Sequence, residues 1–219
     1  MGMGVNLDEH MQAMQQHKRM LQDARKRQGQ CPQDRKERDM LLFEFKMALM
    51  STATRTSTKA PGMLYRSFIL PAYPPCTASL NNLKPIAIRN LTLETHHRGS
   101  YVLSRTITPP DRTTAIVVLA EDEHGDAAIL QLYLQEDEAS RPATSIVNKG
   151  SILLVKEPFL NVMGRNEYAL RVDHLSDVVS LRSEDPRVPQ SWRPRLLNIG
   201  RSANSLKLEG NTCVGKGEY

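Results

Sequence analysis

Aromatic residues and long apolar runs are scarce in this sequence. Only 5% of its 219 residues are aromatic and 40% are hydrophobic, which is below the usual apolar share of a globular chain. We therefore expect a packed core over only part of the length. No run approaches the roughly 18 apolar residues that span a bilayer, and the Met-rich start lacks the apolar stretch of a signal peptide. These absences predict an intracellular protein, cytoplasmic or nuclear, with no membrane contact.

Residues that carry chemistry are also scarce. The three cysteines, Cys31, Cys76 and Cys213, lie far apart and form neither a CxxC pair nor a Cys/His spacing, so neither a disulfide framework nor a zinc site is expected. The sequence has no glycine-rich phosphate loop, no GxSxG turn and no pair of catalytic carboxylates. The residues by themselves predict no catalytic, cofactor-binding or metal-binding site.

What the sequence does have is a division into segments of different composition. Residues 1–50 read as a basic helical arm, because apolar residues at three- and four-residue spacings predict helices over 8–27 and 34–50. In the second helix Leu41, Phe45 and Leu49 share a face, so the helix is expected to dock on the following domain or on a partner. Residues 51–85 are rich in Pro, Ser and Thr and predict a linker.

From residue 86 the apolar pattern changes to that of short strands. Segments rich in Val, Ile, Leu and Thr, such as "SYVLSRTIT" and "TTAIVVLAE", are separated by turn signals such as "TPPDR" and "DEHGD". A short helix is expected within 136–150, which gives the order β-β-β-α-β-β. We therefore predict an α+β, mainly β fold over 86–183: a small OB-like antiparallel barrel, with a plain antiparallel sheet and a helix lid as the alternative. Residues 184–202 form a second linker.

A cluster of acidic residues surrounds Gly125 and raises the question of a metal site. The segment links two predicted strands in five residues, which favours a hairpin whose glycine takes a positive φ. It lacks the longer loop that calcium coordination needs. We therefore interpret this cluster as a charged hairpin: Glu121, Asp122, Glu123, His124 and Asp126.

Two further sets of residues were considered as functional sites. Asp173 and His174 would suit a general base, but no nucleophile accompanies them, and neighbouring residues of a strand point to opposite faces. The alternative function is single-stranded nucleic-acid binding by an OB-type face. Residues 86–183 hold 10 Lys and Arg against 13 Asp and Glu, a balance that opposes phosphate binding. The residues of that face would be Lys156, Arg171, Tyr133 and Tyr168.

The last 17 residues, "ANSLKLEGNTCVGKGEY" (203–219), fit the first half of the 34-residue tetratricopeptide repeat. Gly210 then stands at the eighth position, Ala203 at the first and Tyr219 at the seventeenth. The first helix of the repeat is present in this pattern and its partner helix is not. We therefore expect the chain to be a truncated product, a short gene model or a fragment.

Taken in order, "LETHHRGSYVLSRTITPPDRTTAIVVLAEDEHGDAAILQLYLQEDE", "VKEPFLNVM", "LRVDHLSDVVSL", "VPQSWRPRLL" and "EGNTCVGKGEY" resemble the N-terminal region of fungal proteins that combine tetratricopeptide repeats with a SET domain. The resemblance runs from about Leu64 to Tyr219. It implies that full-length relatives are protein-lysine methyltransferases that use S-adenosylmethionine. The asparagine-histidine motif and the catalytic tyrosine region of the SET domain have no counterpart in these residues, so no catalytic or cofactor role is carried over.

The resemblance therefore implies a non-catalytic protein-interaction or scaffolding region, and this chain is expected not to be an enzyme. Its partner would be a protein, such as the C-terminal tail of a chaperone or a histone-associated protein. In repeats that clamp a chaperone tail, the first helix contributes a Lys and an Asn, and "KLEGN" places Lys207 and Asn211 at those positions. Such a clamp grips a terminal carboxylate by charge-assisted hydrogen bonds.

Overall fold

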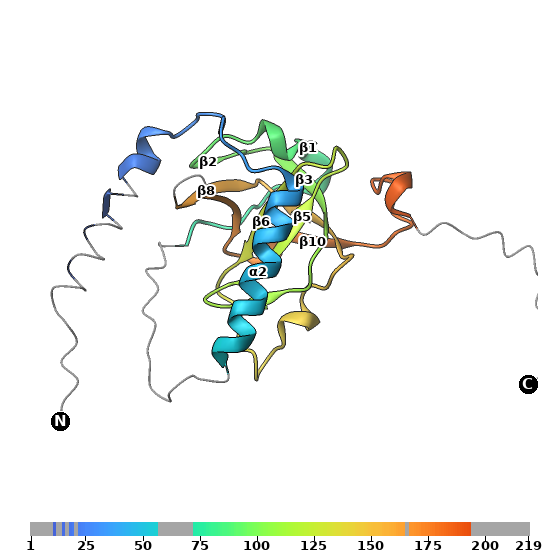
Figure 1. The fold of residues 1–219 in the computed structure, drawn as a ribbon. Helices are drawn as coiled ribbons and strands as arrows, with labels where there is room; N and C mark the ends of the chain where they lie inside the picture. The colour runs from blue at the N-terminus through green and yellow to red at the C-terminus, as the bar shows by residue number, and fades with distance from the viewer. Residues whose placement is uncertain are drawn as a thin grey trace, which may run out of the picture. The chain divides into compact units, whose positions relative to one another are not determined.

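The structure is a computed structural model that describes residues 22–56, 72–164 and 167–193, together with positions 11, 15, 18 and 19. Its contacts divide the chain into two units, Met1–Arg182 and Ser183–Tyr219. The first unit holds the sheet and the long helix α2 (Arg38–Thr56), which contacts β5 and β6 (Figure 1). No helix in the described part of the chain is long and apolar enough to cross a membrane.

In the described part of the chain ten strands form one mixed sheet, and their hydrogen-bonded order is β10-β7-β3-β5-β6-β9-β8-β2, with β1 beside β3 and β4 beside β5. The strands are β1 (Lys84–Pro85), β2 (Thr95–His96), β3 (Ser100–Thr106), β4 (Asp111–Arg112), β5 (Ile116–Glu121), β6 (Ala127–Leu132), β7 (Ile152–Lys156), β8 (Phe159–Gly164), β9 (Glu167–Val172) and β10 (Val178–Leu181). The predicted α+β, mainly β class is confirmed.

The finer prediction of an antiparallel barrel is not confirmed. Strand β6 pairs with β9 in parallel, and so does β1 with β3, so the sheet is mixed. Among the described residues the path of paired strands begins at β10 and ends at β2, and the sheet is not closed. The period-2 pattern reports that a segment is a strand, but it carries no information on the direction of the neighbouring strand.

The core cluster lies on one face of the sheet, because it takes alternate residues from the strands. In β6 the residues Ala128, Leu130 and Leu132 are buried in the core, and the residues between them are only half-buried. Strands β5, β7 and β9 add Val118, Val155 and Leu170 among others. The alternate residues of β6 face the opposite side of the sheet, where α2 lies.

Two segments that precede the sheet in sequence are hydrogen-bonded to it. The backbone of Gly29 and Gln30 pairs with Leu93, through N–H···O distances of 2.9 and 3.0 Å. The N–H of Tyr73 donates to the Asp173 carboxylate at 3.2 Å, and the N–H of Cys76 donates to Asp177 at 2.9 Å. Parts of the predicted arm and of the predicted linker thus belong to the first unit.

Helices were predicted in three segments that the structure describes at least in part. The helix expected over 34–50 is observed as α2, which begins at Arg38 and continues to Thr56. The helix expected within 136–150 is a single 3-10 turn, η3 (Ala143–Ser145). Residues 22–26 of the helix expected over 8–27 are helical. The half-repeat at 203–219, with Lys207 and Asn211, lies outside the described residues.

The second unit is described over residues 183–193. It contains a short 3-10 helix, η5 (Gln190–Trp192), and the buried side chain of Val188. The Arg187 guanidinium donates to both carboxylate oxygens of Asp185, at 2.8 and 2.7 Å. This pairing lowers the pKa of Asp185 to about 2.

Candidate functional site

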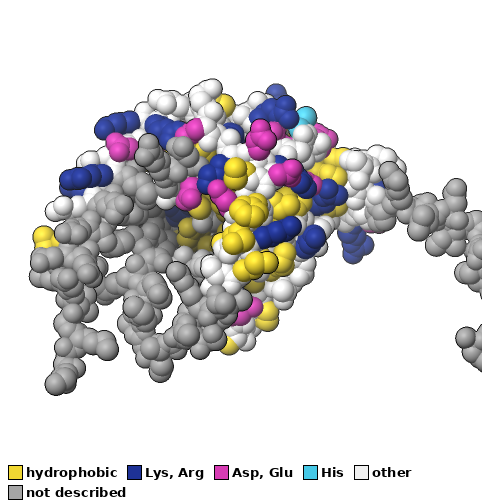
Figure 2. All heavy atoms as spheres, in the orientation of Figure 1, with side chains coloured by type: hydrophobic (Ala, Val, Ile, Leu, Met, Phe, Trp, Pro, Cys, Tyr) yellow, Lys and Arg dark blue, Asp and Glu magenta, His cyan; other side chains and the backbone are white. Residues whose placement is uncertain are grey.

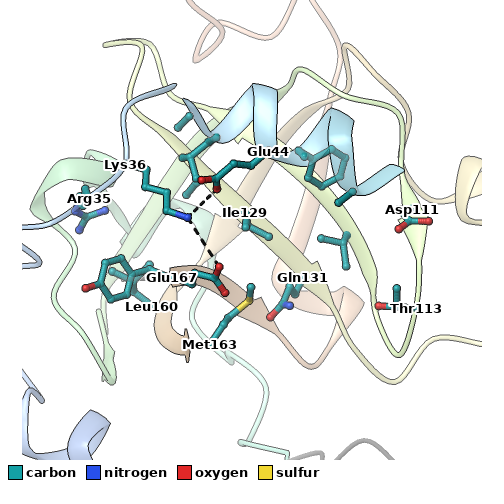
Figure 3. A pocket seen from close by; sticks show the side chains of 17 residues that line it. Arg35, Lys36, Glu44, Asp111, Thr113, Ile129, Gln131, Leu160, Met163 and Glu167 are labelled. Carbon is teal, nitrogen blue, oxygen red and sulfur yellow. Dashed lines mark hydrogen bonds and ion pairs between the residues drawn. The ribbon is translucent and has the colours of Figure 1, made fainter. Parts of the chain in front are cut away.

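A cavity of about 510 Å³ lies between α2 and the face of the sheet opposite the core (Figure 3). We call it the α2 cavity. Its size is that of cavities that enclose drug-sized ligands. The sheet contributes residues from β4, β5, β6, β8 and β9, and α2 forms the other wall.

The walls of the α2 cavity are mainly apolar, and the strand period explains why. Val117 of β5 and Ile129 of β6 occupy the positions that alternate with core residues, so their side chains face α2. Leu41 and Phe45 of α2 face them from the other side, one turn apart. The rest of the apolar lining comes from β8, from β6 and from α2: Leu160, Met163, Ala127, Ala128 and Ala48.

Charged side chains stand around this apolar lining. The ammonium of Lys36 donates to Glu44 Oε2 at 2.7 Å and lies 3.9 Å from Glu167 Oε1, so it sits between two carboxylates (Figure 3). The hydrogen bond to Glu44 raises the pKa of Lys36. Arg35 lies at one end of the cavity and Asp111 at the other.

Arg35 is unusual among the charged residues of the cavity. Burial lowers the pKa of Arg35, and its Nη2 donates to the Leu91 carbonyl at 2.6 Å. Its buried Nε has no acceptor within the described part of the chain. Such a buried donor costs free energy unless an acceptor meets it.

The opposite side of α2 carries a second apolar surface. Met40, Phe43 and Met47 recur at three- and four-residue spacings, and their exposed fractions are 54%, 62% and 51%. We call these three residues the outer stripe. Figure 2 shows hydrophobic side chains gathered in this region of the surface, with lysine and arginine among them.

The acidic cluster around Gly125 forms the predicted hairpin between β5 and β6, and Gly125 takes a φ of +85°. The Asp122 carboxylate accepts hydrogen bonds from the N–H groups of Ile88, His124 and Asp126, at 2.8, 2.9 and 3.1 Å. These contacts give Asp122 a structural role in the turn. Among the described residues no group of three or more His, Cys, Asp or Glu could hold a metal ion.

Glu121 of the same hairpin joins α2 to the sheet. It is 5% exposed, and its carboxylate accepts hydrogen bonds from Arg38 and Arg105, both at 2.6 Å. Burial raises the pKa of Glu121, but the two arginines lower it by more, so the pKa lies below the ordinary value of 4.5. The carboxylate is therefore held in its charged form.

The residues predicted for a nucleic-acid face are placed as follows. The Arg171 guanidinium lies 5.3 Å from the centre of the Tyr133 ring, and it is 5% exposed. It also donates to both oxygens of Asp173, at 2.8 and 2.9 Å. Tyr168 accepts a hydrogen bond from Arg27 at 2.7 Å and donates to Asp34 at 2.5 Å. Lys156 lies on β7, which β3, β5 and β6 separate from β9. These contacts join Tyr133 to Arg171 only, and the nucleic-acid alternative stays a prediction.

Sequence reasoning missed the role of Tyr73, which fastens the segment at 72–77 to β9. Its hydroxyl donates to the Arg171 carbonyl at 3.0 Å and accepts from the N–H of Asp173 at 3.2 Å. His174 Nε2 donates to the Tyr73 carbonyl at 2.6 Å. Burial raises the pKa of Tyr73 to about 12. The signal in the sequence was an aromatic residue among prolines in "LPAYPPC", where a linker has little use for one.

No family model matches this chain. A curated protein of Gibberella zeae named "Methyltransferase" is 38% identical over 167 residues, which is 76% of this chain and 23% of that protein. The chain therefore spans about a quarter of the length of the curated relative that it matches. Among solved structures, Schizosaccharomyces pombe Pot1pC bound to ssDNA (CGGTTACGGT) is 11% identical with a TM-score of 0.36, over 47% of this chain and 90% of that chain. A likeness of that size carries no argument.

These findings correct one expectation. This chain was expected not to be an enzyme, and that expectation is wrong, because 38% identity over most of the chain to a protein named a methyltransferase points to an enzyme. The expectation rested on the absence of the SET motif from these 219 residues. The tetratricopeptide and SET organisation stays a prediction.

Proposed function

We propose that this chain is part of a methyltransferase-related enzyme, and that α2 on the mixed sheet is a protein-docking region of that enzyme. The observation that carries this proposal is that α2 has large apolar side chains turned away from the sheet as well as toward it. Leu41 and Phe45 face the sheet, whereas Met40, Phe43 and Met47 are each more than half exposed. A surface helix normally keeps its apolar side chains on the one stripe that faces the core. The exposed outer stripe therefore supports the proposal that a protein partner covers it.

The chemistry of the outer stripe suits a protein surface. Two of its three residues are methionines, whose flexible thioether side chains adapt to differently shaped apolar partners. Exposed apolar patches of this kind mark sites of protein association. The stripe is one helix wide, which fits a partner that lays a helix or a shallow groove along α2.

We propose that the partner is another region of the same enzyme. The Gibberella zeae relative is about four times as long as the matched segment, so most of that protein is available to pack against this region. The expected tetratricopeptide repeats, the SET domain and the methyl donor S-adenosylmethionine belong to this proposal for the longer protein. None of the described residues is assigned to the methyl donor.

The proposal is tested by mixing this chain with the remainder of the Gibberella zeae relative, produced as a separate protein, in a titration calorimeter. Binding with a dissociation constant of about 1 μM is expected. Phe43→Glu places a charge in the middle of the outer stripe and is expected to weaken binding at least about tenfold.

Lys149→Glu is the matched control, because Lys149 is exposed and lies outside α2. It also makes the surface more negative, at a place away from the outer stripe, and should leave binding unchanged. If the folded wild-type chain shows no binding at 100-fold higher concentration, about 100 μM, docking on the remainder of the Gibberella zeae relative is refuted.

A further inference from the structure

We propose that the α2 cavity binds a basic side chain of an extended peptide, and that Lys36 occupies the position of that side chain in the free protein. The inference does not rest on the proposed function, because the cavity lies between α2 and the sheet and the outer stripe lies on the opposite side of α2. The proposed ligand has two parts: a cationic group for the carboxylates and apolar neighbours for the walls.

The charges around the cavity define the cationic part. Glu44, Glu167 and Asp111 contribute three carboxylates, and Arg35 and Lys36 contribute two cations. Asp111 forms no ion pair with any residue that the structure describes. When Lys36 leaves, the carboxylates of Glu44 and Glu167 lose the cation between them, and that imbalance favours a positively charged ligand. The apolar walls beside these carboxylates suit the alkyl stem of a lysine or arginine side chain.

Lys36 shows how such a ligand would be held. Its stem runs into the cavity, and its ammonium ends between Glu44 and Glu167 (Figure 3). Its side chain is 26% exposed, so the ammonium can leave the cavity and become hydrated again. The exchange of Lys36 for an incoming basic side chain replaces one charge-assisted hydrogen bond by another. Lys36 therefore acts as an internal competitor that weakens binding.

The size of the cavity favours a peptide over a free amine. A cavity of about 510 Å³ has room for a drug-sized ligand, which is larger than one side chain, so the residues beside the basic one are needed to fill it.

The test uses three probes on the full 219-residue chain: the acetylated and amidated pentapeptide Ala-Leu-Lys-Leu-Ala, the same peptide with norleucine in place of lysine, and n-butylammonium chloride. Binding is followed by NMR through the methyl groups of Ile129 and Met163, which line the cavity. We expect the lysine peptide to shift both signals and to bind at least about tenfold more tightly than either of the other probes.

Variants of the cavity residues test whether their charges bind the lysine peptide or whether the peptide only fills an open cavity. Lys36→Met removes the internal competitor and is expected to tighten binding of the lysine peptide about tenfold. Glu167→Gln, which keeps the shape of a side chain that is 51% exposed, is expected to weaken it. Glu123→Gln is the matched control, because Glu123 is exposed on the β5–β6 hairpin and does not line the cavity. Thermal melts of each variant establish that the fold is kept.

Each contrary result overturns a defined part of the proposal. Equal binding of the lysine and norleucine peptides would show that the site recognises the apolar part of the peptide and not its charge. Equal binding of n-butylammonium would assign the site to a free amine. A Lys36→Met chain that binds no more tightly than the wild type would remove Lys36 from the role of competitor. None of these results bears on docking through the outer stripe, which the calorimetric experiment tests separately.

Discussion

At the scale of single residues, the side chains with the largest structural consequences are charged groups that the sheet has buried. Glu121 lies between Arg38 of α2 and Arg105 of β3, and it is 5% exposed. Asp122, next to it, is 4% exposed and holds the backbone of the hairpin. If such a carboxylate loses its partners, or if the partners lose the carboxylate, the buried charge that remains costs free energy that no ion pair offsets.

Replacement of Glu121 by glutamine is therefore expected to lower the free energy of unfolding by about 2 kcal/mol. The arginines are 39% and 34% exposed and can be hydrated in part, which keeps the loss below that of a fully buried pair. Urea denaturation at pH 7 measures it. Glu123→Gln changes an exposed neighbour and should stay within about 0.5 kcal/mol of the wild type. An equal effect of both variants would mean that the two arginines do not stabilise the fold through Glu121.

The lowered pKa of Glu121 also predicts an acid dependence. A group whose pKa is lower in the folded state stabilises that state above its ordinary pKa, here 4.5, and the contribution is lost as the pH falls through the lower folded value. The wild type is thus expected to lose its advantage over Glu121→Gln as the pH falls below 4.5. Urea midpoints of both proteins at several pH values between 6 and 3 would show the two curves converging. Parallel curves would contradict the prediction.

The contribution of Tyr73 to the stability of the fold is expected to be lost at alkaline pH. Burial raises its pKa to about 12, above the ordinary value of 10, so its contribution is complete below pH 10 and is lost as the pH rises toward 12. Tyr73→Phe removes the hydroxyl and is expected to cost about 1 kcal/mol at pH 8, because the N–H of Asp173 loses an acceptor. Between pH 10 and 12 the difference between wild type and variant should shrink, since only the wild type has this group to ionise. A constant difference in unfolding free energy over that range would refute the assignment.

At the scale of elements, α2 is held to the sheet by a few contacts on one side only. Leu41 and Phe45 face the α2 cavity, and Arg38 reaches Glu121. Phe43, two residues before Phe45, points away and is 62% exposed. The two phenylalanines therefore make a matched pair for measuring how firmly α2 is docked.

Phe45→Ala is expected to speed hydrogen exchange of the α2 amides about tenfold or more, while the amides of β5 and β6 keep their protection. The reason is that Phe45 contributes apolar contact with the sheet that alanine cannot replace. Phe43→Ala should leave exchange in α2 nearly unchanged. Faster exchange after the Phe43 change alone would mean that the wrong face of α2 has been taken as the docked one.

The sequence could predict much of the element scale and part of the candidate site. Three- and four-residue spacing located α2 and placed Leu41 and Phe45 on one face, and enrichment in Val, Ile, Leu and Thr between turn signals located the strands. The same patterns did not find Lys36 beside Glu167, because 131 positions separate the two residues and periodicity reports only local neighbours. The parallel pairing of β6 with β9 was missed for the same reason. The acidic hairpin was predictable, because the five residues that make it are consecutive.

At the scale of the whole molecule, distant segments complete the first unit. Arg27 reaches Tyr168, and Tyr73 reaches Asp173, across separations of 141 and 100 residues. Composition suggested an arm and a linker at these places, since both segments are polar or rich in proline. The attachment of these segments depends on single side chains such as Tyr73. The average composition of a segment does not reveal the role of one residue. The first unit therefore includes parts of the chain that precede the β-rich segment.

The division after Arg182 gives a prediction for the whole chain. Because the sheet, α2 and the segments fastened to them all lie within Met1–Arg182, a chain that ends at Arg182 should keep the fold of the first unit. Its melting temperature is expected to stay within about 2 °C of that of the full chain, with one cooperative transition. Circular dichroism during heating measures both.

Removal of the first 30 residues is the instructive comparison, because it deletes Arg27 and the backbone pairing of Gly29 and Gln30 with Leu93. That shorter chain should melt several degrees lower, since a stability loss of about 1 kcal/mol shifts the midpoint of a domain of this size by about 2–4 °C. If the chain that ends at Arg182 is the one that melts lower or aggregates, and the chain without residues 1–30 does not, then the sheet depends on residues after Arg182 and the division into two units is wrong. If instead the chain without residues 1–30 is the one that melts lower, the stabilising contacts come from the N-terminal segment, in which Arg27 donates a hydrogen bond to Tyr168.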